Sequence, residues 1–201
     1  MPDFFQIQTQ TGWGQVLKTF ADWCQPQPGW NTLDVGCGPG LLPSLLAQRG
    51  CRAFGVDRDE KALFPHSLYD QIVMADALRL PFSGRSFDLV TASNLLFLLP
   101  EPVAALAEMA RLLRPGGQIT VLNPSERLSV TAATALAGQR GLQGVARDSL
   151  INWATQAEAN QRWGEAELHA LFAAAGLRLT GTVLKVGPGL ARFARAVRFE
   201  D

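Results

Sequence analysis

The 201-residue sequence has few cysteines, no excess of either charge and no long apolar run. Its three cysteines, at positions 24, 37 and 51, are odd in number and show no paired spacing, which argues against a disulfide framework or a zinc site. Basic and acidic residues both total 18, so the formal net charge is zero. A protein that binds nucleic acid through phosphate contacts usually carries a basic excess, and this balance argues against such a partner.

The sequence shows neither a targeting leader nor a membrane-spanning run. It opens with MPDFFQIQTQTGW, which is polar within a few residues, and no apolar run reaches the roughly 18 residues that a spanning helix needs. Hydrophobic residues make up 47% of the chain, enough for the core of a single domain over residues 1–201. We therefore expect a cytoplasmic protein, a monomer or homodimer, without a membrane, nucleic-acid or metal partner.

Short apolar strands alternate with helices over the first part of the chain. Strands are predicted at residues 32–35, 52–56, 71–74, 86–92 and 118–122, and helices at 41–49, 59–64 and 102–113. This alternation is typical of an α/β fold with a parallel sheet and helices on both faces. Right-handed crossovers then make the sheet doubly wound, in the Rossmann-like manner.

The two flanks depart from this alternation. Residues 1–29 are predicted to form an N-terminal cap with a helix at 12–25. Residues 124–163 form a helical insertion after strand 5, with helices at 126–137 and 148–159, and we interpret it as a lid. A helix at 165–175 and two strands at 177–186 and 190–199 close the chain. The turn Gly187-Pro188-Gly189 makes the last strand antiparallel, so the sheet is mixed.

A glycine-rich stretch, LDVGCGPG at residues 33–40, follows the first strand. Its G-x-G-x-G spacing differs from the G-x-G-x-x-G of dinucleotide-binding folds. Asp34 lies two residues before the first glycine, where its charge would repel a phosphate. The loop therefore suits a ligand that presents an ammonium group or another donor, and Cys37 within it is interpreted as a small packing residue, not a nucleophile.

Acidic residues also follow the second and third strands. Asp57 can accept hydrogen bonds from both ribose hydroxyls of an adenosine, although aspartates at strand ends also cap helices. Asp76 could accept from the exocyclic amine of adenine, and the amide of Ala77 could donate to a ring nitrogen.

Four motifs in order, LDVGCGPG, GVD, ADALRLPFSGRSFDLV and LLRPGGQITV, resemble those of class I S-adenosylmethionine-dependent methyltransferases. The resemblance covers residues 30–122 well and 164–199 loosely. It is closest to the small-molecule branch that includes the ubiquinone and menaquinone C-methyltransferases. The resemblance implies a seven-stranded sheet of order 3-2-1-4-5-7-6, S-adenosylmethionine as cofactor, S-adenosylhomocysteine as its product and a small-molecule acceptor.

The resemblance also implies roles for individual residues. The loop backbone would hold the methionine part of the cofactor, Asp34 would lie near its amino group, and Asp57 would bind the ribose. Arg58 would lie against the face of the adenine, and Asp76 and Ala77 would form hydrogen bonds with its edge. Asn94 would approach the methionine part and the transferred methyl group. The set of expected cofactor-binding residues is Asp34, Gly36, Cys37, Gly38, Gly40, Asp57, Arg58, Asp76, Ala77 and Asn94.

The sequence identifies no catalytic residue, because methyl transfer from a sulfonium depends mainly on in-line orientation of the acceptor. His66 and His169 are the candidate bases, and each is interpreted first as a solvated residue. The fourth strand ends in Ser93-Asn94-Leu95, without the two prolines and aromatic residue of enzymes that methylate amide or nucleobase nitrogens. The O-, N- or C-acceptor stays open, as do a nicotinamide-dependent oxidoreductase and a non-enzymatic S-adenosylmethionine-binding regulator.

Overall fold

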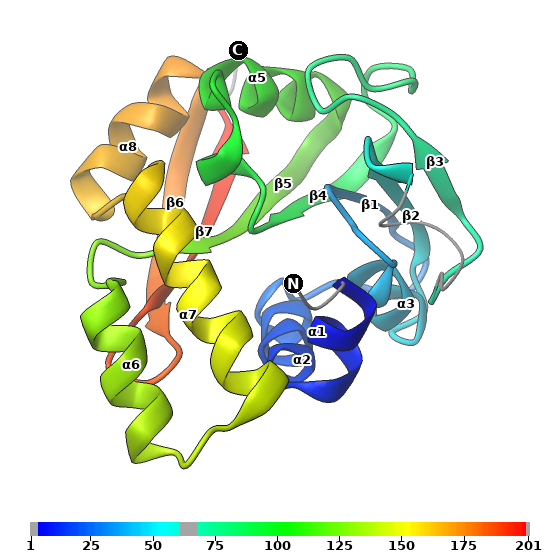
Figure 1. The fold of residues 1–201 in the computed structure, drawn as a ribbon. Coiled ribbons are helices and arrows are strands. Elements are labelled where there is room, and N and C mark those ends of the chain that lie inside the picture. Colours follow the sequence, from blue (N-terminus) through cyan, green and yellow to red (C-terminus); the bar gives the residue numbers. More distant parts are fainter. Residues whose placement is uncertain (1–3, 61–67, 200–201) are drawn as a thin grey trace.

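The computed structural model describes residues 4–60 and 68–199, which build a seven-stranded sheet between layers of helices (Figure 1). The strands are β1 (Asn31–Val35), β2 (Arg52–Asp57), β3 (Ile72–Met74), β4 (Phe87–Ser93), β5 (Leu113–Pro124), β6 (Leu177–Lys185) and β7 (Ala191–Arg198). They lie in the order β3-β2-β1-β4-β5-β7-β6. Strands β1 to β5 are parallel, whereas β7 is antiparallel to β5 and β6. The predicted mixed sheet and its strand order are confirmed.

Helices cover both faces of the sheet. On one face, α2 (Trp13–Trp23) and α3 (Leu41–Ala47) bury Phe20 and Leu46. On the other face, α5 (Pro102–Leu112) and α8 (Glu165–Ala174) bury Leu106 and Phe172. Since helices cover both faces, the central strands β1 and β4 are buried along nearly their whole length rather than on alternate residues.

Two more helices, α6 (Val130–Gln139) and α7 (Gly144–Ala159), follow β5 and pack against each other. They are the predicted helical insertion. Helix α7 also contacts α1 (Phe4–Gln10), and Figure 1 shows α7 running across the molecule toward α1 and α2. The insertion and the N-terminal helices therefore meet at one end of the sheet, although they lie far apart in the sequence.

The insertion helices begin at other residues than expected. The helix expected from residue 126 begins at Val130, because the Ser129 hydroxyl accepts a hydrogen bond from Ala132 N at 3.0 Å and caps its first turn. The helix expected from residue 148 already begins at Gly144.

Other limits differ as well. Strand β5 begins at Leu113, five residues before the expected start at Gln118, because Leu113 pairs with Phe87 and the register shifts before Leu89. The first helix, α1, and a short 3-10 turn, η1 (Leu96–Leu98), were not expected. The helix expected at residues 59–64 falls mostly outside the described residues. Within residues 4–60 and 68–199, no helix has the length and apolarity to span a bilayer.

Candidate functional site

A cavity of about 590 Å³ opens at the carboxyl ends of the central parallel strands. The strand ends contribute residues 34–38, 57–59, 75–77 and 93–95 to its wall, and the facing wall comes from α1, α2, α6 and α7. In open α/β sheets, ligands bind outside the carboxyl ends of the strands. Every predicted site residue except Gly40 lines this cavity, which is therefore the candidate site.

The glycine loop is held tightly at the bottom of the cavity. The backbone nitrogens of Gly36 and Cys37 both donate to Val56 O, at 2.8 and 3.0 Å. Gly36 has a φ of +74°, and a Cβ on it would lie 3.0 Å from the side chain of Leu95. A larger residue at this position would strain the backbone and clash with Leu95, just after β4. With glycine here, the backbone of the loop can face the cavity directly.

Asp34 is the most buried acid of the cavity wall, with 1% of its surface exposed. Desolvation by burial raises the pKa of its carboxyl to about 8, against the opposing effect of a hydrogen bond from Thr91, and the nearby charge of Asp57 raises it further. The Thr91 hydroxyl donates to Asp34 Oδ1 at 2.7 Å. Asp34 is therefore a mostly neutral carboxyl at pH 7, and a charged ligand beside it would shift its pKa.

Asp57 and Asp76 each hold the backbone around them. Asp57 Oδ2 accepts a hydrogen bond from Gly38 N at 2.8 Å, and its Oδ1 accepts from Asp59 N at 2.9 Å. Asp76 Oδ1 accepts from Leu78 N at 3.0 Å. Carboxylate oxygens can accept more than one bond, so these contacts fix the orientation of the acids and leave acceptor capacity for a ligand.

Asn94 connects the sheet to the insertion. It lies at the end of β4 with a φ of +55°, and its backbone nitrogen donates to Leu122 O at 2.7 Å. Its side-chain oxygen accepts a hydrogen bond from the indole nitrogen of Trp153 on α7, at 3.0 Å. The Trp153 ring in turn lies 5.3 Å from the ring of Trp13 on α2. One chain of contacts thus joins β4, α7 and α2 at the cavity.

Gly40 lies outside the cavity wall. It is the N-cap of α3 with a φ of +92°, and a Cβ on it would lie 2.6 Å from Ile72 Cδ1 and 3.0 Å from Tyr69 Cβ. The structure thus places Gly40 where α3 packs beside β3, and its expected contact with a cofactor stays a prediction.

Cys37 fits the expected packing role. Its side chain is buried, and a Cβ on Gly55 would lie 2.7 Å from Cys37 Sγ, so the thiol packs against bare backbone. Burial raises the pKa of the Cys37 thiol, and the charges of Asp34 and Asp57 raise it further. The thiol therefore stays protonated, which argues against a nucleophilic role.

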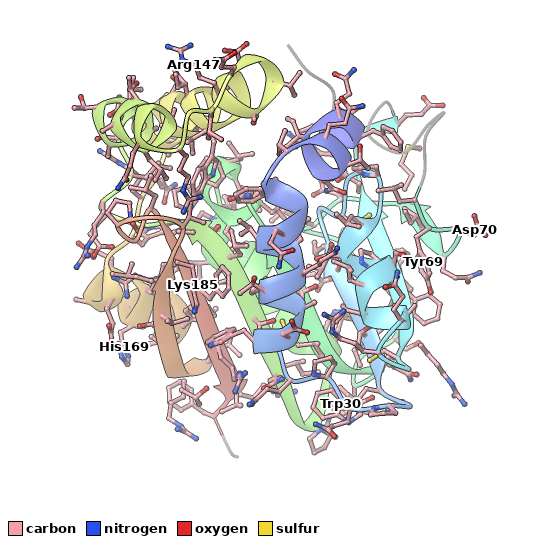
Figure 2. All side chains as sticks on the ribbon, turned by 90° about the horizontal axis from the view of Figure 1, so that it is seen from below. Trp30, Tyr69, Asp70, Arg147, His169 and Lys185 are labelled. Atoms are coloured by element: carbon pink, nitrogen blue, oxygen red, sulfur yellow. The ribbon has the colours of Figure 1, made fainter. Side chains whose placement is uncertain are left out.

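Of the two histidines, His66 lies outside the described residues. His169 is exposed on α8, Figure 2 shows it at the outer side of the molecule, and it does not line the cavity. Among the residues that are described, no group of His, Cys, Asp and Glu is arranged to hold a metal ion.

Sequence reasoning predicted that residues 124–163 form a lid, but it assigned none of the residues of the facing wall to the site. On α7 the cavity-lining positions are 146, 149, 150, 152, 153 and 156, which lie on one side of the helix because they recur every three or four residues. This period can be read from the sequence, but the cavity that these residues face cannot. Other residues of this wall that were not assigned to the site include Phe4, Ile7, Gln8, Leu136, Arg140, Leu142 and Val186.

Sequence comparisons agree with the expected resemblance. A family model described as "Methyltransferase domain" matches residues 33–121. The ubiquinone biosynthesis O-methyltransferase of Ralstonia nicotianae is 37% identical over 111 residues, covering 49% of this chain and 46% of that protein. The enzyme of the same name from Aromatoleum aromaticum is 34% identical over 99 residues, covering 45% and 42%. The chain thus spans less than half the length of these relatives.

Structural comparisons agree on the fold. The magnesium protoporphyrin IX methyltransferase of Synechocystis PCC 6803, solved with bound S-adenosylhomocysteine, superposes with a TM-score of 0.66 at 21% identity, covering 99% of this chain and 89% of that one. A methyltransferase from Aquifex aeolicus gives a TM-score of 0.63 at 16% identity, covering 91% and 87%. In motif sequence and fold, the chain is similar to the class I S-adenosylmethionine-dependent methyltransferases. Within that class it is similar to quinone methyltransferases.

Proposed function

We propose that the protein transfers a methyl group from S-adenosylmethionine to a small-molecule acceptor bound beneath α6 and α7. The observation that carries this proposal is the continuity of the cavity: one space joins the glycine loop and the acids of the strand ends to the apolar faces of the insertion and the N-terminal helices. Such a space can place two ligands in contact, which transfer between them requires.

The strand-end half of the cavity fits the cofactor. Asp34, Asp57, Asp59 and Asp76 line it against the single cation of Arg58, so its wall carries an excess of acids. S-adenosylmethionine carries a sulfonium and an ammonium, and an acidic wall favours both. In this proposal the backbone of residues 36–38 holds the methionine part of the cofactor, Asp57 binds the ribose and Asp76 binds the adenine.

The chain's own contribution to the reaction is then one of position and enclosure. The bound cofactor supplies the activated methyl group. Asn94 and Trp153 stand where the strand ends meet the insertion, so they border both ligands. Residues 124–163 act as a lid and residues 1–29 as a second cover, which together exclude water from the acceptor. Orientation in an enclosed site can supply about 7–11 kcal/mol of barrier reduction, so a base is not required for an acceptor that is already nucleophilic.

The relatives are named O-methyltransferases, and an oxygen acceptor is accordingly the first to test. A nicotinamide-dependent oxidoreductase is disfavoured, because the G-x-G-x-G spacing of residues 36–40 differs from the G-x-G-x-x-G of dinucleotide-binding folds. A non-enzymatic S-adenosylmethionine-binding regulator would bind the cofactor without turnover. We further propose that the protein works in the cytoplasm as a monomer or homodimer, without a nucleic-acid partner.

Thermal unfolding with S-adenosylhomocysteine, S-adenosylmethionine and NADH tests the cofactor site. A ligand at 100 times its Kd adds about 2.7 kcal/mol of stability. That corresponds to a rise in Tm of roughly 5–10 °C for a chain of this size. We expect this rise with the first two ligands and its loss in Asp57→Ala. Asp70→Ala is the matched control, because Figure 2 shows Asp70 at the outer edge of the molecule, and it does not line the cavity. A shift with NADH alone would overturn the proposal.

Methyl transfer itself is tested with labelled S-adenosylmethionine and a set of phenolic, amine and thiol acceptors. Transfer to any of them by the wild type, and its loss in Asp57→Ala, would support an enzyme. Binding of the cofactor without transfer to any member of the set would favour the regulator instead.

A further inference from the structure

The titratable side chains are unevenly distributed over the wall of the cavity. The strand ends contribute the acids and Arg58. Among the described residues of the facing wall, contributed by α1, α2, α6, α7 and the turn after β6, Arg140 is the one titratable side chain. The cavity therefore has an acidic end and, across it, a basic end.

Arg140 is free to bind a ligand. It ends α6, where its backbone nitrogen donates to Leu136 O at 3.0 Å. Its guanidinium is exposed and makes no hydrogen bond or ion pair with the residues that the structure describes. By contrast, Arg147 on α7 pairs with Asp148 at 3.5 Å, and Arg127 lies 4.0 Å from Glu126. Leu136 and Arg140 are four residues apart on one helix face, so both reach the same cavity.

The wall between Arg140 and the strand ends is largely aromatic and aliphatic. The hydrogen bond to Asn94 fixes the edge of the Trp153 ring, while Trp13 packs against that ring at an angle of 57°. Leu136, Leu142, Leu150 and Val186 complete this part of the wall. Aromatic and aliphatic surfaces of this kind favour planar, apolar ligands.

We propose that the acceptor is a planar, mostly apolar molecule with an anionic substituent, a carboxylate or a phenolate, which Arg140 binds. The ring lies along Trp153, and the anion points away from the cofactor, toward the end of α6. Guanidinium and carboxylate match in geometry, and the pair satisfies the one unpaired cation of this wall. This inference rests on the proposed methyltransferase function and adds the chemical class of its acceptor.

A pair of probes that differ only in charge tests the inference: 1-naphthoate and 1-naphthamide. Their binding to protein saturated with S-adenosylhomocysteine is measured by equilibrium dialysis. We expect the wild type to bind the naphthoate about tenfold or more tightly than the amide, since hydrogen bonds to charged groups exceed neutral ones by this order. Arg140→Gln should lower the affinity for the naphthoate to that of the amide and leave the amide unchanged.

Arg147→Gln is the matched control. Figure 2 shows Arg147 on the outer side of the insertion, and it does not line the cavity. It removes the same charge from the same pair of helices, and we expect it to keep the wild-type preference. An equal loss in both variants would mean a long-range effect of net charge and would overturn the role of Arg140.

The affinity for S-adenosylhomocysteine, measured first in all three proteins, separates the two proposals. If it is normal and the wild type binds the two probes equally, or binds neither, the inference is overturned and the proposed function stands. If S-adenosylhomocysteine does not bind the wild type, the proposed function fails and this inference fails with it.

Discussion

Asp34 is expected to release a proton when S-adenosylmethionine enters the cavity. Desolvation raises the pKa of this carboxyl to about 8, so in the free protein at pH 7 about nine-tenths of it is protonated. The ammonium of the cofactor, which we propose lies close to Asp34, favours the ionised form and lowers that pKa. Binding is therefore coupled to deprotonation of a single buried group.

The size of the coupling follows from the pKa. If the bound form titrates below about pH 5.5, close to 0.9 proton leaves per cofactor bound at pH 7. The affinity for the cofactor then rises by about an order of magnitude from pH 6 to pH 7, since one pKa unit corresponds to about 1.4 kcal/mol. In this range the α-amino group of the cofactor keeps its charge, so the change comes from the protein.

Calorimetry in buffers of different ionisation enthalpy measures the released proton directly, as the slope of the observed binding enthalpy against the buffer's. Asp34→Asn is the informative variant, because its amide oxygen can still accept the hydrogen bond from Thr91. We expect a slope near one proton for the wild type and near zero for the variant, whose affinity should also be flat from pH 6 to pH 7. Equal slopes in the two proteins would refute this account of Asp34.

The same raised pKa predicts that Asp34 destabilises the cofactor-free protein at neutral pH. The pKa of Asp34 in the folded protein lies above its ordinary value of 3.8, so the contribution of Asp34 to stability is complete below pH 3.8 and is lost as the pH rises to about 8. Without cofactor, Asp34→Asn should therefore raise the free energy of unfolding at pH 7, by up to about 4 kcal/mol, and should have little effect near pH 4. Urea unfolding at the two pH values measures this difference.

Substitutions at two positions, Gly40 and Trp153, test the packing around the site. Gly40→Ala places a Cβ 2.6 Å from Ile72 Cδ1 at a φ of +92°, and we expect it to lower the free energy of unfolding in urea by about 2–4 kcal/mol. The control Gly116→Ala, at a φ of +76° with nothing within 4 Å of the new Cβ, should lower it by only about 1 kcal/mol. Equal losses in the two variants would contradict a steric clash at Gly40. Trp153→Phe removes the hydrogen bond to Asn94 and should lower the free energy of unfolding by about 1 kcal/mol, and Trp153→Ala by about 2–3 kcal/mol. A smaller loss in Trp153→Ala than in Trp153→Phe would contradict this order.

The sheet was predictable because its signals are local. Apolar runs and turn glycines predicted the strands. Their order in the sheet was implied by the resemblance to a known family. The insertion limits were not predictable to the residue, because the start of α6 depends on which polar residue caps it: Ser129 does so, and the expected start at Glu126 lies in a turn. Helix α1 was missed because its short polar segment is stabilised by contacts with α2 and α7.

The candidate site was predictable where residues follow the carboxyl ends of parallel strands. The glycine loop and the acids after the strands all reach the cavity, because these strand ends lie at one edge of the sheet. The hydrogen bond between Asn94 and Trp153 joins residues 59 apart, and no local pattern marks it. Likewise, the bond from Gly38 N to Asp57 depends on the parallel pairing of β1 and β2, which brings two strand ends together.

The limit of the sequence match bears on the proposed acceptor specificity. The matching methyltransferase model ends at residue 121, after the glycine loop, Asp57, Asp76 and Asn94 but before α6 and α7. The shared part is the half of the cavity proposed for the cofactor, and the facing wall with Arg140 and Trp153 belongs to the part that this model does not cover. Under the proposed function, a relative's acceptor is expected for this chain only if that relative's insertion presents the same wall. We therefore expect the charge and shape of that wall, rather than the shared motifs, to decide which molecule is methylated.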